Sequence, residues 1–482
     1  MKRTSIFNAV IIGIFLNSFG LFAQDKKWTL EECVSYAMEH NISIKSSDLD
    51  LQLSQIDKKD ARGAFLPTIN AGANHSWNIG LNQNITTGLL ENQTTQFTSA
   101  NLNVGIDIYK GLQNQIQLRR SNLAILASRY AVTKMQEDVS LNVVNAYMQI
   151  LFNKENLKVQ QKQLEYDSKQ LERVTQMVEA GNVPQGDLMD IQATVANDNQ
   201  LIITAENNLL ISKISLAQLL QLEDFETFDI EATTMDVSHS AVLMENASEI
   251  VKKAMESRTT LKVASSQVEL AEKDLQLAKS RYLPTLQGFY SFNTRAAYAD
   301  QVVGYQINPN NPFSVIGTVE GTNQNVVTQN FSPLLGSPDD LWQQFDNNKG
   351  QNFGLSLNVP ILNGLSVRHN VERNKVNVLK SKLNLDTEKQ NVQRTVYTAF
   401  TDTKAALKSH EAALSTLEFR KKSYEYAQER YAVGLITIFD FTQAQTLYAN
   451  AQSEVLRTKY DYIFKTKILE FYYGIPLVSL NN

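Results

Sequence analysis

The chain has 482 residues, with 45 Lys and Arg against 50 Asp and Glu, for a formal net charge of −5. The charges are spread along the chain without a basic patch or stripe, which argues against nucleic acid as a partner. The one cysteine, Cys33, cannot form an internal disulfide, so cysteine usage indicates no redox compartment.

Residues 1–23 have the pattern of a secretory signal. Lys2 and Arg3 give a basic start, residues 10–16 are mostly apolar, and Ala23 is a small residue at the expected cleavage site. The apolar stretch is too short to span a bilayer, so we expect export rather than an anchor. No later segment approaches 18 uninterrupted apolar residues, so helical membrane spans are not expected.

The rest of the chain consists of two copies of one sequence unit. The Leu-Pro-Thr run at 66–68 returns at 283–285, a shift of 217, while the segment 178–192 returns at 431–445, a shift of 253. The difference of 36 residues predicts an insertion in the second copy. We therefore divide the chain into these parts: a first repeat at 24–221, a connecting segment at 222–245, and a second repeat at 246–482 with the insertion at about 296–350.

Each repeat is predicted to begin with a helix, at about 29–63 and about 246–282. Pro67 and Pro284 end these helices, because the residue before a proline avoids the helical region. The sequence period then changes from 3.6 to 2. Apolar and polar residues alternate in four segments, at 68–79, 99–108, 352–361 and, less regularly, 285–295. Such alternation over roughly ten residues is typical of transmembrane β-strands, although a soluble sheet with one buried face is an alternative.

A very long helix is predicted after each pair of strands. Residues 112–180 and 365–433 contain no proline or glycine, and each stretch has 69 residues. A helix of that length reaches on the order of 100 Å. Apolar residues recur at spacings of three and four, which favours coiled-coil packing. A long dimeric rod is an alternative for this part alone.

Each long helix ends at a short break that begins with Gly181 or Gly434, and glycine is the expected residue just past a helix end. A second helix then returns over 187–221 or 440–473, so we predict two helical hairpins per chain. The connecting segment is expected to be short, mixed in structure and packed against the helices. The insertion is rich in Asn, Gln, Gly and Pro and poor in charge, which predicts an external loop that is partly ordered at best.

Four strands cannot close a barrel, because membrane-spanning barrels need about eight or more. If these strands cross a membrane, the chain must therefore oligomerise. Two copies would supply eight strands and three copies would supply twelve. Strand counting does not choose between a dimer and a trimer.

The two breaks share a pattern in which Gly is followed by x5-Asp and then by Gln five residues later. The pattern is clearest from Arg430 to Gln445, where Tyr431 precedes the glycine, and looser from Glu179 to Gln192. With the signal and the duplicated plan, it resembles TolC-like outer membrane efflux proteins over nearly the whole mature chain. The resemblance implies a mainly α fold with transmembrane β: three protomers build a 12-stranded outer-membrane β-barrel on a periplasmic α-barrel.

The resemblance also implies a function and partners. Members of the family act as the passive exit duct of a tripartite efflux or type I secretion system. The implied partners are two further copies of the chain, outer-membrane lipid, a periplasmic adaptor (membrane fusion) protein and an inner-membrane transporter. We expect the duct to open when the adaptor and the transporter engage it.

Acidic residues at the hairpin tips line the constricted periplasmic entrance in this family. Asp187 and Asp440 match that position in the two repeats, and Asp190 lies one turn after Asp187. Rings of carboxylates favour cations and bind divalent ions. The alternative for each aspartate is a local one, because Asp at a helix start is also a capping pattern.

Tyr431 matches a family tyrosine whose hydrogen bonds help to keep the entrance shut. Gly181, Gly434 and Leu435 match the exposed tip that adaptors grip, with helix termination as the alternative for the glycines. The chain departs from the family at Ile436, where some members carry a closing arginine.

No catalytic, cofactor or metal motif accompanies these features. The five histidines are scattered without metal-ligand spacing: His40, His75, His239, His369 and His410. Gly-x-Gly-x-x-Gly, P-loop and Gly-x-Ser-x-Gly patterns are also missing from the sequence. We therefore expect neither an enzyme nor a cofactor. The competing hypothesis is a non-conducting periplasmic coiled-coil scaffold or adaptor, although adaptors usually carry one long hairpin between soluble β-domains.

Overall fold

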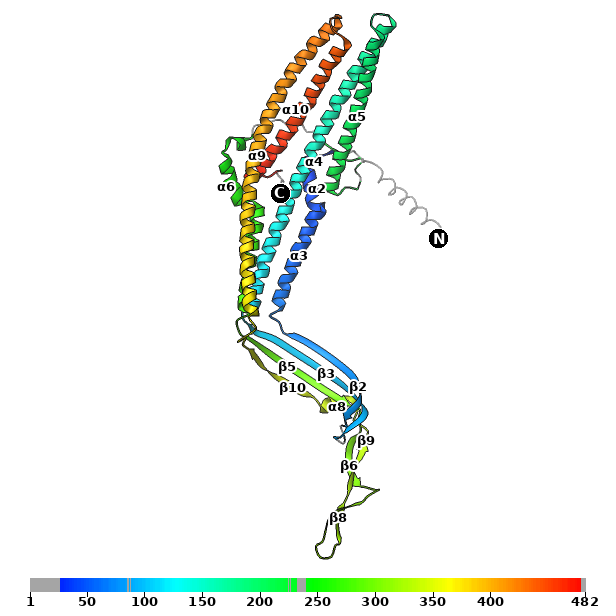
Figure 1. The fold of residues 1–482 in the computed structure, drawn as a ribbon, viewed down its shortest axis with the longest axis vertical. Helices are drawn as coiled ribbons and strands as arrows, with labels where there is room; N and C mark the ends of the chain where they lie inside the picture. The colour runs from blue at the N-terminus through cyan, green and yellow to red at the C-terminus, as the bar shows by residue number, and fades with distance from the viewer. Residues whose placement is uncertain are drawn as a thin grey trace, which may run out of the picture. The chain divides into compact units, whose positions relative to one another are not determined.

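The computed structural model describes residues 27–84, 86, 88–223, 225, 227–231 and 240–477, so the predicted signal at 1–23 lies outside the described residues. The chain divides into two compact units (Figure 1). The first, which we call the helical unit, comprises Met1–Gln55, Leu123–Ala271 and Asn377–Asn482. The second, the strand unit, comprises Ile56–Asn122 and Glu272–Val376.

Four long helices form the two predicted hairpins: α4 (Gln113–Glu179), α5 (Gln185–Leu220), α9 (Ser366–Ala432) and α10 (Ile438–Tyr473). α4 and α9 have 67 residues each, which confirms the prediction from the absence of Pro and Gly. Asn153 of α4 donates to the Asn208 carbonyl of α5 at 3.1 Å, and Thr403 of α9 donates to the Lys465 carbonyl of α10 at 3.0 Å. Of the helices in the described part of the chain, none combines the length and apolar character that a membrane crossing requires.

The predicted helix at 29–63 is divided into α2 (Leu30–His40) and α3 (Ile42–Gly63), which corrects the expectation of one continuous helix. Asn41 separates them in an extended conformation. Its side chain donates to the Leu219 carbonyl at 2.9 Å and accepts from the Ser43 backbone N–H at 2.9 Å. The break therefore depends on a contact with α5, which no local periodicity can reveal.

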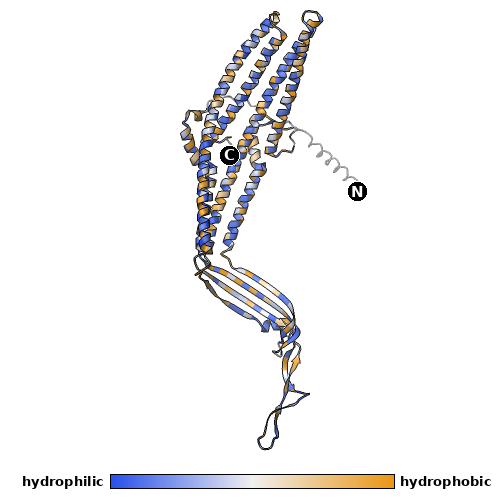
Figure 2. Cartoon of the chain, in the orientation of Figure 1, coloured by the Kyte–Doolittle hydropathy of each residue, from blue (hydrophilic) through white to orange (hydrophobic). Residues whose placement is uncertain are grey.

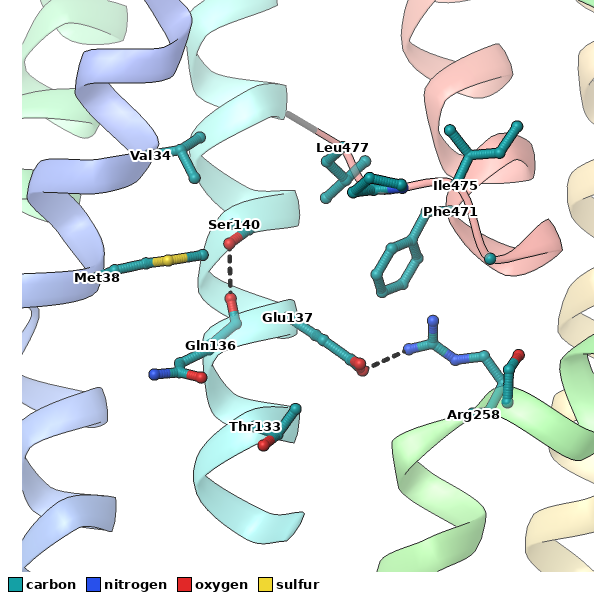
Figure 3. A pocket seen from close by; sticks show the side chains of 13 residues that line it. Val34, Met38, Thr133, Gln136, Glu137, Ser140, Arg258, Phe471, Ile475 and Leu477 are labelled. Carbon is teal, nitrogen blue, oxygen red and sulfur yellow. Dashed lines mark hydrogen bonds and ion pairs between the residues drawn. The ribbon is translucent and has the colours of Figure 1, made fainter. Parts of the chain in front are cut away.

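The predicted helix at 246–282 is divided in the same way, into α6 (Ala247–Ser257) and α7 (Thr259–Ser280), with Arg258 extended between them. Arg258 donates to Glu137 of α4 at 2.7 Å, and Thr259 donates to the other carboxylate oxygen at 2.7 Å. The Arg258 guanidinium also lies 4.0 Å from the centre of the Phe471 ring. Glu137, Arg258 and Phe471 border a cavity of about 410 Å³ (Figure 3). Since Arg258 follows Asn41 by 217 positions, both repeats break at the same point.

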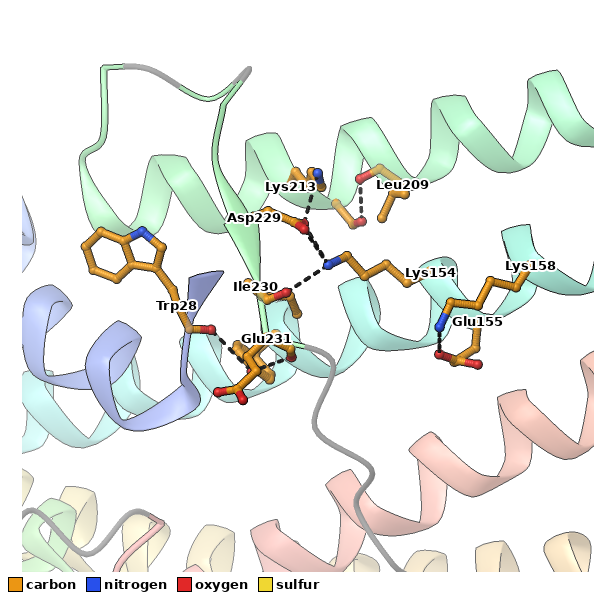
Figure 4. A network of polar contacts seen from close by, with 11 residues as sticks. Trp28, Lys154, Glu155, Lys158, Leu209, Lys213, Asp229, Ile230 and Glu231 are labelled. Atoms are coloured by element: carbon orange, nitrogen blue, oxygen red, sulfur yellow. Dashed lines mark hydrogen bonds and ion pairs between the residues drawn. The ribbon is translucent and has the colours of Figure 1, made fainter. Parts of the chain in front are cut away.

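The connecting segment contributes β4 (Asp229–Ile230), which pairs in parallel with β1 (Lys27–Trp28), and the 3₁₀ helix η1 (Ala241–Met244). Asp229 lies between Lys154 of α4, at 2.7 Å, and Lys213 of α5, at 3.0 Å (Figure 4). Burial raises the pKa of the Asp229 carboxyl, but the hydrogen bonds from the two lysines outweigh this effect and hold the pKa below its usual range. The segment is thus fastened to the first hairpin by an ionic contact.

The strand unit contains an antiparallel four-stranded sheet in the order β10-β5-β3-β2. Its strands lie where the alternation predicted them: β2 (Thr68–Gln83), β3 (Leu90–Lys110), β5 (Thr285–Ala297) and β10 (Gly350–Asn358). β10 ends before Pro360, which has no N–H to donate to a ladder. β2 and β10 are the edge strands, and within the described part of the chain each pairs with one neighbour.

The register separates the side chains of the sheet into an apolar face and a polar face. Ile69, Val104, Tyr290 and Phe353 form one row across the four strands. The next row, on the opposite face, consists of Asn70, Asn103, Ser291 and Asn352. The apolar side is exposed in the single chain, with Phe353 at 78%. Figure 2 shows the alternation as bands along the strands.

The insertion at about 296–350 is more regular than the sequence predicted. It contains two separate two-stranded ladders, β6 (Gln301–Ile307) with β9 (Phe331–Gly336) and β7 (Phe313–Thr318) with β8 (Asn325–Gln329). A short helix, α8 (Leu341–Asn347), follows. The buried Gln344 side chain accepts from the Ala297 N–H at 2.9 Å and donates to the Ala297 carbonyl at 3.0 Å. The expectation of partial order at best was wrong, because β-branched and aromatic residues alternate among the Asn and Gly residues that dominated the composition.

Candidate functional site

Both hairpins turn at a left-handed glycine. Gly181 has φ of 71° and Gly434 has φ of 75°, a region that side chains with a Cβ rarely adopt. The Asn182 N–H then bonds to the Met177 carbonyl at 2.9 Å, and the Leu435 N–H bonds to the Arg430 carbonyl at 2.8 Å. These two glycines therefore end their helices by the predicted mechanism. Leu435, at the tip itself, is 69% exposed.

The tips of the two hairpins pack against each other within one chain. The buried residues of this tip cluster come from α4, α5 and α10: Val174, Ile191, Ile438 and Phe441. Tyr424 and Tyr431 of α9 are partly buried against them. Apolar contacts therefore join the first repeat to the second at the end where the sequence predicts an entrance.

Tyr431 contacts both hairpins. Its ring stacks on Phe441 with centroids 5.0 Å apart. Burial is the largest influence on its hydroxyl and raises the pKa, while a hydrogen bond with Gln170 and the charge of Arg173 oppose the rise. Asp187 is close enough to raise this pKa further. The structure thus brings Tyr431 and Asp187, two of the predicted gate residues, to the same place.

The capping alternative has a different outcome for the two aspartates. Pro184 is the N-cap of α5, and no side chain caps that helix, so capping is wrong as the role of Asp187. In α10, Thr437 is the N-cap: its hydroxyl accepts from the Asp440 N–H at 3.2 Å and donates to the Asp440 carboxylate at 2.9 Å. Asp440 therefore supports a cap, and its carboxylate also lies at the positive end of a helix dipole.

The three predicted aspartates are not clustered in one protomer. Asp190 lines a cavity of about 500 Å³ together with Gln443, its counterpart in the second repeat. Asp440 and Arg430 both line a groove of about 670 Å³. No group of three metal-ligating side chains occurs among the residues that the structure describes. A carboxylate ring therefore requires several copies of the chain.

The profile for outer membrane efflux proteins matches residues 33–221 and 250–472, which is most of the chain. The chain belongs to the outer membrane efflux protein family. TolC of Salmonella enteritidis, named an outer membrane protein, is 23% identical over 489 residues, covering 98% of this chain and 88% of TolC.

Two solved structures have the same fold as the present chain. VceC of Vibrio cholerae has a TM-score of 0.71 at 13% identity, covering 92% of this chain and 96% of VceC. CmeC of Campylobacter jejuni, an outer membrane channel, has a TM-score of 0.72 at 17% identity, covering 94% of this chain and 87% of CmeC. Membership of the outer membrane efflux protein family gives an outer-membrane efflux duct as the coarse function, and the two solved structures agree with it in fold.

Sequence reasoning missed several residues of the tip region in this efflux protein. Phe441 forms the centre of the aromatic contacts, and Tyr424 lies 5.9 Å from it between ring centroids. Phe441 and Tyr424 follow the apolar spacing of the sequence, but every other buried helix position follows the same spacing, so it did not identify them as tip residues. Asp167, which is fully buried on α4, gave no signal because a single aspartate in a charged helix resembles a solvated residue. Gln445 was part of the repeated pattern, yet the pattern assigned it no role.

Proposed function

We propose that three copies of this chain form an outer-membrane duct whose periplasmic entrance is closed by the hairpin tips. The observation that carries the proposal is the sheet, with two free edges, one apolar face and one polar face. Pairing β2 of one copy with β10 of the next satisfies both edges, and three copies supply twelve strands. An exposed edge of this length invites pairing with another chain.

The two faces suit the two surroundings of such a duct. The face that carries Tyr290 and Phe353 would contact lipid, and the face that carries Asn103 and Ser291 would line a wet lumen. Thr86, which follows β2, donates to the carbonyl of Asp300, at the start of the insertion, so both lie at the same end of the sheet. Long loops of membrane barrels usually face outside, so the insertion would lie outside the cell. Its sparse charge suits contact with other copies or with the outer surface.

The tip cluster would hold the entrance shut. Tyr431 of the second hairpin is hydrogen-bonded to Gln170 of the first and lies within the electrostatic influence of Asp187, and Asp187, Asp190 and Asp440 would form acidic rings once three copies assemble. The glycine turns and Leu435 present an exposed end that a periplasmic adaptor can grip. An inner-membrane transporter would supply the energy, and the duct itself would remain passive.

Single-channel conductance of the purified mature protein in planar bilayers tests this proposal. We expect discrete steps that divalent cations on the periplasmic side reduce, and native mass spectrometry should give a trimer. A variant that loosens the tip, Tyr431→Phe with Asp187, Asp190 and Asp440 each replaced by Ala, serves as the open control. If neither protein conducts, the non-conducting scaffold is the better description.

A further inference from the structure

A buried polar group in the first hairpin connects three helices near the entrance. Asp167 of α4 is fully buried. One of its carboxylate oxygens accepts from Gln445 of α10 at 2.7 Å, and the other accepts from Gln163, one turn earlier on α4, at 2.8 Å. Asp167 is therefore a buried point at which α10 of the second repeat is hydrogen-bonded to α4 of the first.

Asp198 of α5 faces Asp167 and has no cation to balance it. Its side chain is 5% exposed, and one of its carboxyl oxygens has no hydrogen-bond partner among the described residues. Around the pair, α9 presents the hydroxyl of Tyr424, and α5 presents Asp190 on the wall of the cavity that Asp198 also lines. Among the described residues, no ion pair includes Asp167 or Asp198; on α4, Lys158 pairs with Glu155 and Lys169 with Glu165 instead.

Two buried carboxylates in contact cannot both be ionised at little cost, because like charges repel strongly where water is excluded. Burial is the largest influence on Asp198, and the contact with Asp167 adds to it, raising the pKa of Asp198 to about 8. A proton on Asp198 creates an O–H that donates to Asp167. That hydrogen bond satisfies the oxygen that otherwise has no partner.

We propose that Asp167 and Asp198 share one proton, and that the resulting hydrogen bond fastens α5 to α4 in the closed entrance. Gln445 fastens α10 to the carboxylate of Asp167. Loss of the proton places two negative charges opposite each other, and α5 then separates from α4. The effect on conduction rests on the function proposed above, whereas the fastening itself does not.

The fastening is confined to the first hairpin. The positions 253 residues after Asp167 and Asp198 are Arg420 and Ala451, so the second repeat contains no such pair. The duplicated architecture therefore does not require these two acids. A rise in pH should loosen α5 and leave the contact between α9 and α10 unchanged.

Hydrogen exchange of the full-length protein in detergent, from pH 6.5 to 9.5, tests the fastening. After division by the intrinsic exchange rate, amide protection in α5 around residues 191–205 should fall about tenfold per pH unit as the pH rises toward the pKa of Asp198, and should level off above it, where Asp198 is deprotonated in both the closed and the open state. Asp198→Asn should remove this fall, because an amide N–H donates to Asp167 without titrating. Glu206→Gln, which also removes one negative charge from α5 but at an exposed position, should behave as wild type.

Two results would overturn the fastening: no fall in wild-type protection up to pH 9.5, or the same fall in Asp198→Asn. Gln445→Leu supplies a second arm, because it should lower the protection of α10 at every pH and leave the pH response of α5 in place. A pH response of α5 that changes with Gln445 would also count against the proposal.

Conductance separates this inference from the proposed function. In a conducting trimer, open probability should rise as the pH approaches 8 and level off above it in wild type, and stay constant in Asp198→Asn. A protein that never conducts but shows the α5 response would refute the duct and leave the fastening intact. A protein that conducts but whose α5 amide protection does not change with pH would refute the fastening and leave the duct intact.

Discussion

Phe441→Ala should loosen the tip cluster more than any other single truncation there. The Phe441 side chain is 1% exposed and contacts three aromatic rings, those of Tyr431, Tyr424 and Tyr166, at centroid distances of 5.0, 5.9 and 6.2 Å. Replacing a buried Phe by Ala costs about 3–5 kcal/mol, and the three ring contacts favour the upper half of that range. A loss of about 4 kcal/mol corresponds to a roughly thousandfold rise in the population of open tips.

Hydrogen exchange at the hairpin tips measures this population directly, and the conductance of wild type and variant gives the functional consequence. The matched control is Phe439→Ala, two residues earlier on the same helix, where the ring is 62% exposed. An exposed truncation should change stability by no more than about 0.5 kcal/mol. Equal effects of the two substitutions would refute the claim that Phe441 joins the hairpins.

Three further outcomes are expected. Asp187→Ala combined with Asp440→Ala should raise single-channel conductance or weaken the block by divalent cations, and unchanged values for both would refute their place in the gate. Asp229→Asn should lower the melting temperature at pH 7 and have less effect near pH 3. The reason is that a carboxyl with a depressed pKa stabilises the fold above its unfolded pKa, and this contribution is lost as the pH falls. Equal losses of melting temperature at both pH values would contradict this. Gly434→Ala should cost about 1 kcal/mol through backbone strain alone, since nothing lies within 4 Å of the added Cβ, and local exchange at the second tip checks it.

The sequence predicted those parts of the fold that depend on local pattern. The absence of Pro and Gly gave α4 and α9 nearly to the residue, and the period of two located all four strands of the sheet. The glycine turns at 181 and 434 also follow from local backbone preference. Each of these features is set by residues that are neighbours in the chain.

The features that were missed depend on partners far away in the sequence. The break at Asn41 needs the Leu219 carbonyl, 178 residues away, and the break at Arg258 needs Glu137, 121 residues away. Neither partner belongs to a pattern that could have identified it. Asp187 was predicted from a repeated motif and Tyr431 from the family resemblance, whereas Asp167 and Asp198 belong to no repeat.

Features that both repeats share can be assigned to the architecture, whereas residues that differ between the repeats are candidates for a role in the proposed gate. Both copies keep the helix lengths, the glycine turn and the break in the first helix, as a shared architecture demands. They differ in the buried chemistry near the tips, where the first hairpin contributes Asp167 and Asp198 and the second contributes Tyr431 and Phe441. A carboxyl pair responds to protons and aromatic packing does not. If the entrance opens by moving one hairpin against the other, the first hairpin is the one whose hold on the closed state pH can change.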